Sequence, residues 1–241
     1  MTTLTIPNNI TTETVHRVRP IIDDLRTFIR TQRRHDRVHP ELEIRLCRED
    51  SGGISEKAWM RLLSALDACT TWSGKKETSE LVDFFYDAKI QEETVPIRTT
   101  RYISPEGDVC IEHLSKSPVR QTFVRLKGCS SVAQRAKIVF STEESLDPST
   151  LPDLTTTTNV RIKHRRSFMW KSWRFDMTKT WSGSTYSAAT QNRDNNFNTM
   201  CECEIELVDP TRYVDNHNND YISLSLLLKL VGLLPPQCEV A

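Results

Sequence analysis

The chain has 241 residues, of which 37% are hydrophobic and 27% are charged, a composition typical of a soluble globular protein. Its 32 Lys and Arg residues balance its 32 Asp and Glu residues, so net charge gives no argument for a nucleic-acid partner. We expect neither a signal peptide nor a membrane span, because residues 1–14 are polar and the longest apolar run, residues 224–231, is too short to cross a bilayer.

The N-terminal part of the chain predicts an arm followed by a helix. Residues 1–13 are expected to form the arm, and residues 14–241 a single domain. Apolar residues recur at helical spacing over residues 14–34. The basic run that ends this segment, residues 30–35, suits a helix C-terminus, although the same charges could also contact phosphates.

The next segment, residues 40–47, alternates strictly between polar and apolar side chains. Glu41, Glu43 and Arg45 share one face, and the residues between them are apolar. A period of two with one apolar face indicates a β-strand. A helix is then predicted over residues 55–69.

From residue 80 onward the pattern is mostly that of strands. Strands are predicted at 81–89, 95–103, 109–114, 121–126, 135–142, 160–169, 173–181 and 200–208. A polar linker is expected around 148–158, a long loop over 182–199, and an apolar C-terminal helix over 221–234.

The last predicted strand carries Glu202, Glu204 and Glu206 on one face. Side chains two residues apart on a strand lie about 7 Å apart, so these carboxylates repel one another. A metal ion or a set of Arg and Lys side chains would compensate their charge. The alternative is an antiparallel strand whose charged face is in contact with water.

A second strand has a face of the opposite sign, formed by Arg161, Lys163 and Arg165. A barrel of about eight strands is just wide enough to hold one small ligand. If the charged faces line such a barrel, the acidic residues suit a metal ion and the basic residues suit an anion. Together they indicate a metal–polyphosphate ligand.

The acidic and basic sets are each drawn from several strands. Five glutamates, whose hard oxygen atoms suit magnesium or manganese, are Glu41, Glu43, Glu202, Glu204 and Glu206. The basic residues, whose guanidinium groups match phosphate oxygens best, are Arg98, Arg161, Lys163, Arg165 and Arg174. Asp176 shares a face with Arg174 and is expected to hold it in place. The alternative is that these strands form the outside of a sandwich, where cross-strand ion pairs contribute little.

The 7 cysteines are odd in number and include no C-x-x-C pair. Cys201 and Cys203 share a strand face with apolar residues, so we expect core packing rather than zinc binding. The thiols are expected to be reduced, and the protein to be intracellular.

Four of these segments together resemble the motifs of the metal-dependent RNA 5′-triphosphatases. They are E-L-E-I-R at 41–45, R-I-K-H-R at 161–165, R-F-D at 174–176 and E-C-E-I-E at 202–206. This family contains mRNA-capping enzymes of fungi, protozoa and some large DNA viruses, and belongs to the triphosphate tunnel metalloenzymes. The motifs follow the family order, and the short chain looks most like the trypanosomatid members. The resemblance implies a mainly β (α+β) fold, an eight-stranded antiparallel β-barrel tunnel with a few flanking helices.

The resemblance also implies roles for individual residues. Glu41, Glu43 and Glu206 would bind Mn²⁺ or Mg²⁺ directly, whereas Glu202 and Glu204 would act through metal-bound water or hold neighbouring basic residues. The phosphate-binding residues would be Arg98, Lys116, Arg161, Lys163, Arg165 and Arg174.

A further part of the resemblance concerns catalysis. Glu143 would orient the attacking water, with the adjacent Glu144 as the alternative. The catalytic set would be completed by Lys163, Arg165, Arg174 and Asp176. Asp83 would be an acidic residue of the tunnel mouth.

The resulting hypothesis is hydrolysis of the γ-phosphate at the 5′-triphosphate end of nascent mRNA, the first step of cap formation. The expected partners are this RNA and an RNA guanylyltransferase, and the expected location is the nucleus. Arg30, Arg33 and Arg34 are candidates for RNA contacts at the tunnel mouth. The alternatives are an inorganic tripolyphosphatase or nucleotide triphosphatase of the same fold, and a non-catalytic module that binds polyphosphate.

Overall fold

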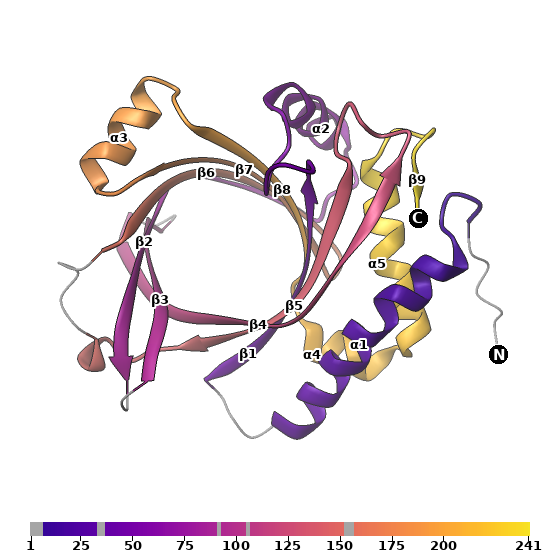
Figure 1. Cartoon of the computed structure of the whole chain (residues 1–241), viewed down its shortest axis with the longest axis horizontal. Helices are drawn as coiled ribbons and strands as arrows, with labels where there is room; N and C mark the ends of the chain where they lie inside the picture. The colour runs from indigo at the N-terminus through magenta and orange to yellow at the C-terminus, as the bar shows by residue number, and fades with distance from the viewer. Residues whose placement is uncertain (1–6, 33–36, 91–92, 105–106, 152–156) are drawn as a thin grey trace.

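The chain folds into a closed ring of strands with helices packed on its outside (Figure 1). This computed structural model describes residues 7–32, 37–90, 93–104, 107–151 and 157–241.

Eight antiparallel strands form the ring. In chain order they are β1 (Val38–Cys47), β2 (Gly74–Ile90), β3 (Glu93–Ile103), β4 (Val109–Lys127), β5 (Arg135–Ser145), β6 (Asn159–Trp170), β7 (Trp173–Gly183) and β8 (Thr199–Leu207). Their order around the ring is β3-β2-β6-β7-β8-β1-β5-β4, and pairing of β3 with β4 closes it. The short strand β9 (Glu239–Val240) pairs with the far end of β4. The predicted fold class, an eight-stranded antiparallel tunnel, is confirmed.

Two-residue alternation determines which side chains face into the ring. On β1, Leu42 and Ile44 are fully buried in the core outside the ring, and Glu41 and Glu43 point inward. The same alternation places the charged residues of β6, β7 and β8 inside the ring. The interior is therefore polar, and the hydrophobic core lies between the strands and the helices.

Most of the helices cover one side of the ring. These are α1 (Thr12–Gln32), α2 (Glu56–Ala68), α4 (Pro210–Asn216) and α5 (Asn219–Leu233). In Figure 1, α1, α4 and α5 lie together beside β1, β4 and β5. None of the helices in the described ranges is long and apolar enough to cross a membrane.

The prediction of a long loop over 182–199 was wrong in part. This segment contains helix α3 (Tyr186–Asp194), whose N-cap Thr185 accepts a hydrogen bond from the amide of Ala188 at 3.2 Å. Its Ala189 is buried in a small hydrophobic cluster on the outside of β6 and β7. The Ser- and Asn-rich composition favours a loop prediction, because such residues are poor helix formers. The helix also buries a single small apolar residue, Ala189, so it shows no apolar periodicity.

The two strands predicted at 109–114 and 121–126 are one continuous strand, β4. Pro118 lies between the two predicted segments and normally breaks a strand. Here the pairing of β4 with β5 shifts between Pro118 and Arg120, and such an irregularity accommodates a proline within a sheet.

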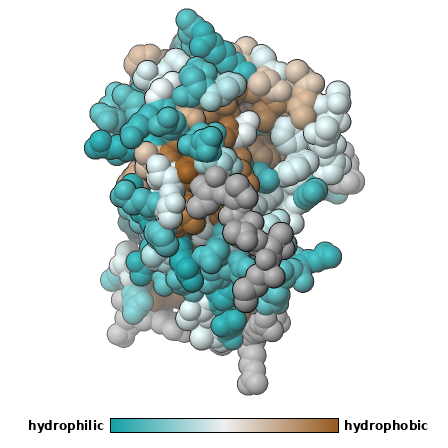
Figure 2. Space-filling view, turned by 90° about the vertical axis from the view of Figure 1, so that its right-hand side faces the viewer, coloured by the Kyte–Doolittle hydropathy of each residue, from teal (hydrophilic) through white to brown (hydrophobic). Residues whose placement is uncertain are grey.

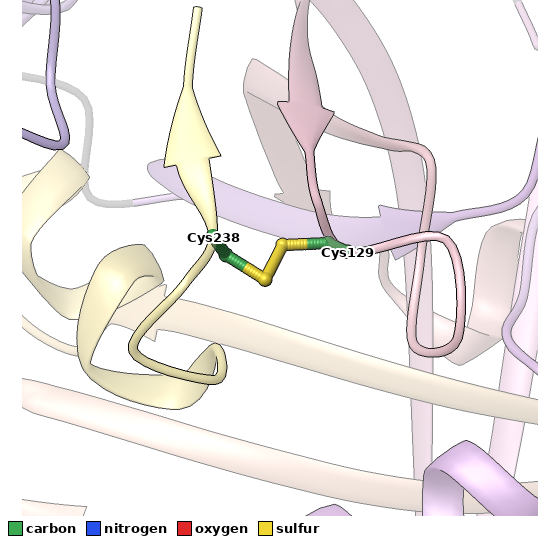
Figure 3. The surroundings of a disulfide bond; sticks show 2 residues. All are labelled: Cys129 and Cys238. Atoms are coloured by element: carbon green, nitrogen blue, oxygen red, sulfur yellow. A yellow bond between two sulfur atoms is a disulfide. The ribbon is translucent and has the colours of Figure 1, made fainter.

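The prediction that all thiols are reduced was wrong for two of them. Cys129 and Cys238 form a disulfide that joins the end of β4 to the segment before β9 (Figure 3). The two cysteines are 109 residues apart, so no local motif signals the bond. The pairing of β9 with β4 brings their Cα atoms to 5.3 Å. Cys201 and Cys203 are buried and free, as core packing requires.

Figure 2 shows the face seen from the right of Figure 1. Hydrophilic residues make up much of this face, and hydrophobic residues are visible in a recess between them. The C-terminus lies at this side of the molecule in Figure 1, away from the interior of the ring.

Candidate active site

The interior of the ring is a tunnel with a volume of about 840 Å³. Acidic and basic side chains line it in nearly equal numbers. The lining includes Glu41, Glu43, Glu202, Glu204, Glu206, Arg98, Lys116, Glu143, Arg161, Lys163, Arg165 and Arg174. The structure thus brings together the predicted metal-binding, phosphate-binding and catalytic residues except Asp176, which is buried directly behind the wall.

The acidic side of the tunnel forms where the first and last strands of the ring meet. On β1 and β8, Glu43 is paired directly with Glu206, and Arg45 with Glu204. Glu43 is 8% exposed, so its carboxylate is largely shielded from water. Two segments from opposite parts of the chain therefore place carboxylates side by side.

Lys116 and Arg174 both contact this acidic cluster. The Lys116 ammonium forms ion pairs with Glu41 and Glu43, the latter at 3.4 Å, and lies 3.9 Å from Glu143. Arg174 bonds to Glu206. Burial lowers the pKa of Lys116, but Glu43 and Glu41 outweigh it and raise the pKa above its ordinary value.

Arg45 compensates the deepest glutamates. Its guanidinium bonds to Glu204 and lies 3.9 Å from Glu202 and 3.7 Å from Glu43. Burial alone would raise the pKa of Glu204, but Arg45 and then Arg165 lower it to about 2. Glu204 is thus held as a carboxylate, and Arg45 is a structural countercharge whose role the sequence pattern did not reveal.

Asp176 positions two of the basic residues. Its carboxylate lies 3.0 Å from Arg174 Nε and 3.3 Å from an Arg165 nitrogen, and it accepts a hydrogen bond from Ser167 Oγ at 2.6 Å. The expectation that Asp176 holds Arg174 agrees with this geometry. Asp176 is 2% exposed, so an approaching anion meets the two guanidinium groups rather than their carboxylate.

Two further basic residues of the site, Lys163 and Arg161, come from β6. Lys163 Nζ lies 2.6 Å from Asp83, which also accepts a hydrogen bond from Thr100 at 2.8 Å. Arg161 is not ion-paired among the described residues, and its guanidinium lies over the Phe85 ring at 4.9 Å. Asp83 lines the tunnel and is buried, which makes it a partner of Lys163.

The alternation of β5 separates the two candidates for a water-orienting residue. Glu143 lines the tunnel and accepts a hydrogen bond from Arg98 at 3.1 Å. Glu144 is exposed and is not part of the tunnel lining. Glu143 is therefore the glutamate of this pair that can act on a ligand in the tunnel.

The raised pKa values of two carboxyl groups indicate that nearby cations do not fully neutralise the acidic cluster. Burial raises the pKa of Glu206 to about 8, although Arg174 opposes this shift. Burial, then the charge of Glu204, also raises the pKa of Glu43. A divalent cation would relieve this cost, and carboxylate oxygens are the ligands that Mg²⁺ and Mn²⁺ prefer. The chemistry of these residues fits such a metal.

The positions of the carboxylates do not by themselves form a coordination sphere. No three His, Cys, Asp or Glu side chains of the described residues converge as metal ligands. Lys116 and Arg174 contact Glu41, Glu43 and Glu206 in this structure.

Several smaller polar residues of the site were not predicted. Ser141 donates to Glu41 at 3.1 Å, and Thr180 donates to Glu202 at 3.1 Å. Both occupy inward positions of strands whose charged residues were identified, so alternation along the same strands would have found them. Lys76 also lines the tunnel, but it precedes the predicted start of its strand at residue 81.

The basic residues proposed for RNA contacts are not part of the tunnel. Arg30 lines a separate cavity between α1 and the α4–α5 turn. Arg33 and Arg34 lie outside the described residues. Cys203 faces the core at 1% exposure, and burial raises the pKa of its thiol, so this residue does not offer a nucleophile to the tunnel.

Comparison with solved structures places this fold among known ones. The S. pombe Pct1 RNA triphosphatase matches with a TM-score of 0.62 and 14% identity, over 95% of this chain and 93% of that chain. A structure of the same triphosphatase in complex with the Spt5 CTD matches with a TM-score of 0.61 and 13% identity, over 95% of this chain and 93% of that chain. The Mimivirus capping enzyme triphosphatase matches with a TM-score of 0.59 and 14% identity, over 92% of this chain and 97% of that chain.

No protein-family model and no curated protein matches the sequence. At 14% identity the structural likeness establishes the fold. The resemblance seen in the four motifs is confirmed at that level, because the chain has the tunnel fold of the RNA triphosphatases. The Glu, Arg and Lys residues of the motifs line the tunnel.

Proposed function

We propose that this chain is a metal-dependent RNA 5′-triphosphatase that removes the γ-phosphate from the 5′ end of nascent mRNA, the first step of cap formation. The observation that carries this proposal is the tunnel itself. Paired carboxylates from β1 and β8 lie on one side, and the Arg and Lys side chains of β6 and β7 lie next to them. Adjacent acidic and basic sets suit a triphosphate that arrives with a metal ion.

The basic set supports recognition of the triphosphate. Arg165 and Arg174 are held by Asp176, and Lys163 is held by Asp83, so their positions are set before a substrate binds. Phosphoryl transfer depends mainly on such positioning and on neutralisation of charge. Arg161 has no carboxylate partner among the described residues and is available to a phosphate oxygen.

In the proposed reaction, Glu143 accepts a hydrogen bond from a water molecule and orients its oxygen toward the γ-phosphorus. The new bond joins this oxygen to the γ-phosphorus, and the bond from the γ-phosphorus to the bridging oxygen breaks. The products are inorganic phosphate and a 5′-diphosphate RNA end, and the proton that the water loses passes through Glu143 to solvent. Arg165 and Arg174 stabilise the charge that develops on the γ-phosphate oxygens.

Mn²⁺ or Mg²⁺ is the proposed cofactor, with Glu41, Glu43 and Glu206 as its ligands. Bound there, it would supply Lewis-acid polarisation of the phosphate oxygens. Glu204 and Glu202 are proposed to keep Arg45 and nearby basic residues in place, because Arg45 contacts both.

The test is phosphate release from γ-labelled triphosphate-ended RNA with Mn²⁺, for the wild type and Glu206→Ala. We expect metal-dependent release that the variant loses. Cleavage of tripolyphosphate but not RNA would instead indicate an inorganic tripolyphosphatase. Tight polyphosphate binding without release from RNA, nucleotide or tripolyphosphate would overturn the enzyme and leave a binding module.

The functional partner and the cellular location belong to the same proposal. A diphosphate RNA end is the acceptor for guanylyl transfer, so an RNA guanylyltransferase is the proposed functional partner. Nascent mRNA is the proposed substrate, and the proposed location is accordingly nuclear.

A further inference from the structure

A second cavity, of about 550 Å³, lies outside the tunnel between the β6–β7 turn and helices α4 and α5. We call it the Trp170 cavity. Its lining combines aromatic and basic side chains: Trp170, Lys171, Trp173, Arg212, Tyr213 and Lys229. The proposed triphosphatase reaction uses none of these residues.

The basic residues of the Trp170 cavity are Lys171, Arg212 and Lys229. None of them forms an ion pair with a carboxylate of the residues that the structure describes. The acidic residue in the lining, Asp209, caps helix α4 by accepting a hydrogen bond from the amide of Arg212 at 2.9 Å. The cavity is therefore a site of uncompensated positive charge, which favours an anionic ligand.

Two of these cations, Lys171 and Lys229, lie near the indole ring of Trp170. Lys229 Nζ lies 3.9 Å from the centroid of the Trp170 ring, and Lys171 Nζ lies 5.0 Å from it. Burial, with the charge of Lys171, lowers the pKa of Lys229. Two ammonium groups near one ring repel each other, and an anion between them would remove that cost.

Aromatic rings continue from this point along α4 and α5. Tyr213 stacks on His217 with ring centroids 4.4 Å apart, and His217 stacks on Tyr221 at 4.5 Å. Tyr221 is 38% exposed, which leaves part of its ring accessible. Aromatic rings interleaved with basic side chains are the combination that binds single-stranded nucleic acid.

The cavity adjoins the tunnel. Met169 on β6 and Arg174 on β7 line the tunnel, whereas Trp170 and Trp173, the next residues toward the turn, line the Trp170 cavity. Because neighbouring residues of a strand face opposite sides, the cavity lies outside the ring at the tunnel end formed by the β6–β7 turn, where an RNA that leaves the tunnel would pass it.

We infer that the Trp170 cavity binds the RNA chain downstream of the 5′-triphosphate, with Lys171, Arg212 and Lys229 on backbone phosphates and exposed aromatic rings stacked on bases. This deepens the proposed function and rests on it for the RNA entering the tunnel. An acidic peptide would also satisfy the cations. RNA is favoured because it supplies regularly spaced charges together with flat bases for the rings.

The test measures RNA binding that does not depend on the triphosphate. The probe is a fluorescent single-stranded RNA of about 12 nucleotides with a 5′-hydroxyl end. We expect Lys171→Glu with Arg212→Glu to weaken binding about tenfold or more and to reduce the salt dependence by about two phosphate contacts. Trp170→Leu is expected to weaken binding about tenfold through lost stacking. The matched control is Arg101→Glu, an exposed charge reversal on the outer face of β3.

Parallel assays separate this inference from the proposed function. Because Lys171 and Arg212 are exposed and do not line the tunnel, their variants should retain the wild-type melting temperature and cleavage of tripolyphosphate. Unchanged RNA affinity would overturn the inference, and so would loss of affinity for an acidic peptide without loss for RNA. If the wild type cleaves neither RNA nor tripolyphosphate but the variants bind RNA more weakly, the proposed reaction fails and the RNA-binding cavity stands.

Discussion

Glu43 on β1 and Glu206 on β8 are direct cross-strand neighbours, although they lie near opposite ends of the chain. Like charges in this position destabilise a sheet, and burial adds to the cost. The pKa values of both carboxyl groups are raised accordingly, that of Glu206 to about 8. The contact between Glu43 and Glu206 therefore destabilises the folded protein, which is common at functional sites.

The first prediction follows from that cost. Glu206→Gln should raise the stability of the metal-free protein at neutral pH, and should abolish phosphate release when Mn²⁺ is present. Because the folded pKa of Glu206 lies above its ordinary value of 4.5, the contribution of Glu206 to stability is greatest at low pH and is lost as pH rises toward 8. The loss due to Glu206 should approach about 5 kcal/mol between pH 4.5 and pH 8, because each pH unit between the two pKa values is worth about 1.4 kcal/mol.

The measurement is the melting temperature in EDTA from about pH 5 to pH 9. The two proteins should differ least at the acid end, because Glu206 is protonated in the folded wild type there and is only partly ionised in the unfolded chain. As pH rises, the melting temperature of the variant should increase steadily relative to that of the wild type. A variant that melts below the wild type at pH 8 would show that this carboxylate is not a source of strain.

Alternation was sufficient to predict which residues of each strand face inward. It correctly grouped Glu202, Glu204 and Glu206 on one face and Arg161 with Lys163 on another, because the period of a strand is two regardless of its neighbours. The order of the four charged motifs along the chain, which matches that of the RNA 5′-triphosphatases, then predicted the eight-stranded tunnel.

What alternation could not predict was the partner of each residue. That Arg45 neutralises Glu204 depends on β1 lying beside β8, a contact between distant parts of the chain. The bond between Cys129 and Cys238 depends in the same way on β9 joining β4. Neither contact leaves a local signal in the sequence.

The second prediction concerns Arg45. Arg45→Met should destabilise the metal-free protein by about 3–5 kcal/mol, because Glu204 and Glu202 would be left without their countercharge in a buried site. Adding Glu204→Gln to this variant should recover much of the loss. A double-mutant cycle by chemical denaturation measures the coupling, and additive effects of the two substitutions would contradict a direct partnership.

The third prediction concerns Asp176. Asp176→Asn should reduce phosphate release by about 100-fold, because Arg165 and Arg174 lose the carboxylate that orients them and a small displacement of such groups is costly. The Michaelis constant for tripolyphosphate should rise as well. Ser167→Ala, which removes a neighbour of Asp176 but leaves both ion pairs, is the control and should lower activity much less.

The fourth prediction concerns the disulfide. Protein unfolded without reductant should expose five alkylatable thiols, and after reduction seven. Cys238→Ser should lower the free energy of unfolding by about 2–5 kcal/mol under non-reducing conditions, because the bond restricts a long loop of the unfolded chain. Reductant should destabilise the wild type to a similar extent and leave the variant unchanged. Equal sensitivity of both proteins to reductant would contradict the bond.

The last prediction uses adjacent glutamates as a matched pair. Glu143 lines the tunnel beside Arg98, whereas Glu144 is exposed and lies outside the lining. Glu143→Gln should lower the turnover number by about 10²–10⁴-fold, the range expected when a group that accepts a proton or orients water is lost. Glu144→Gln removes the same charge one residue away and should leave turnover near that of the wild type. Single-turnover phosphate release at saturating RNA measures this difference. If the two variants lose activity equally, the effect is one of strand stability, and the water must be oriented by another residue.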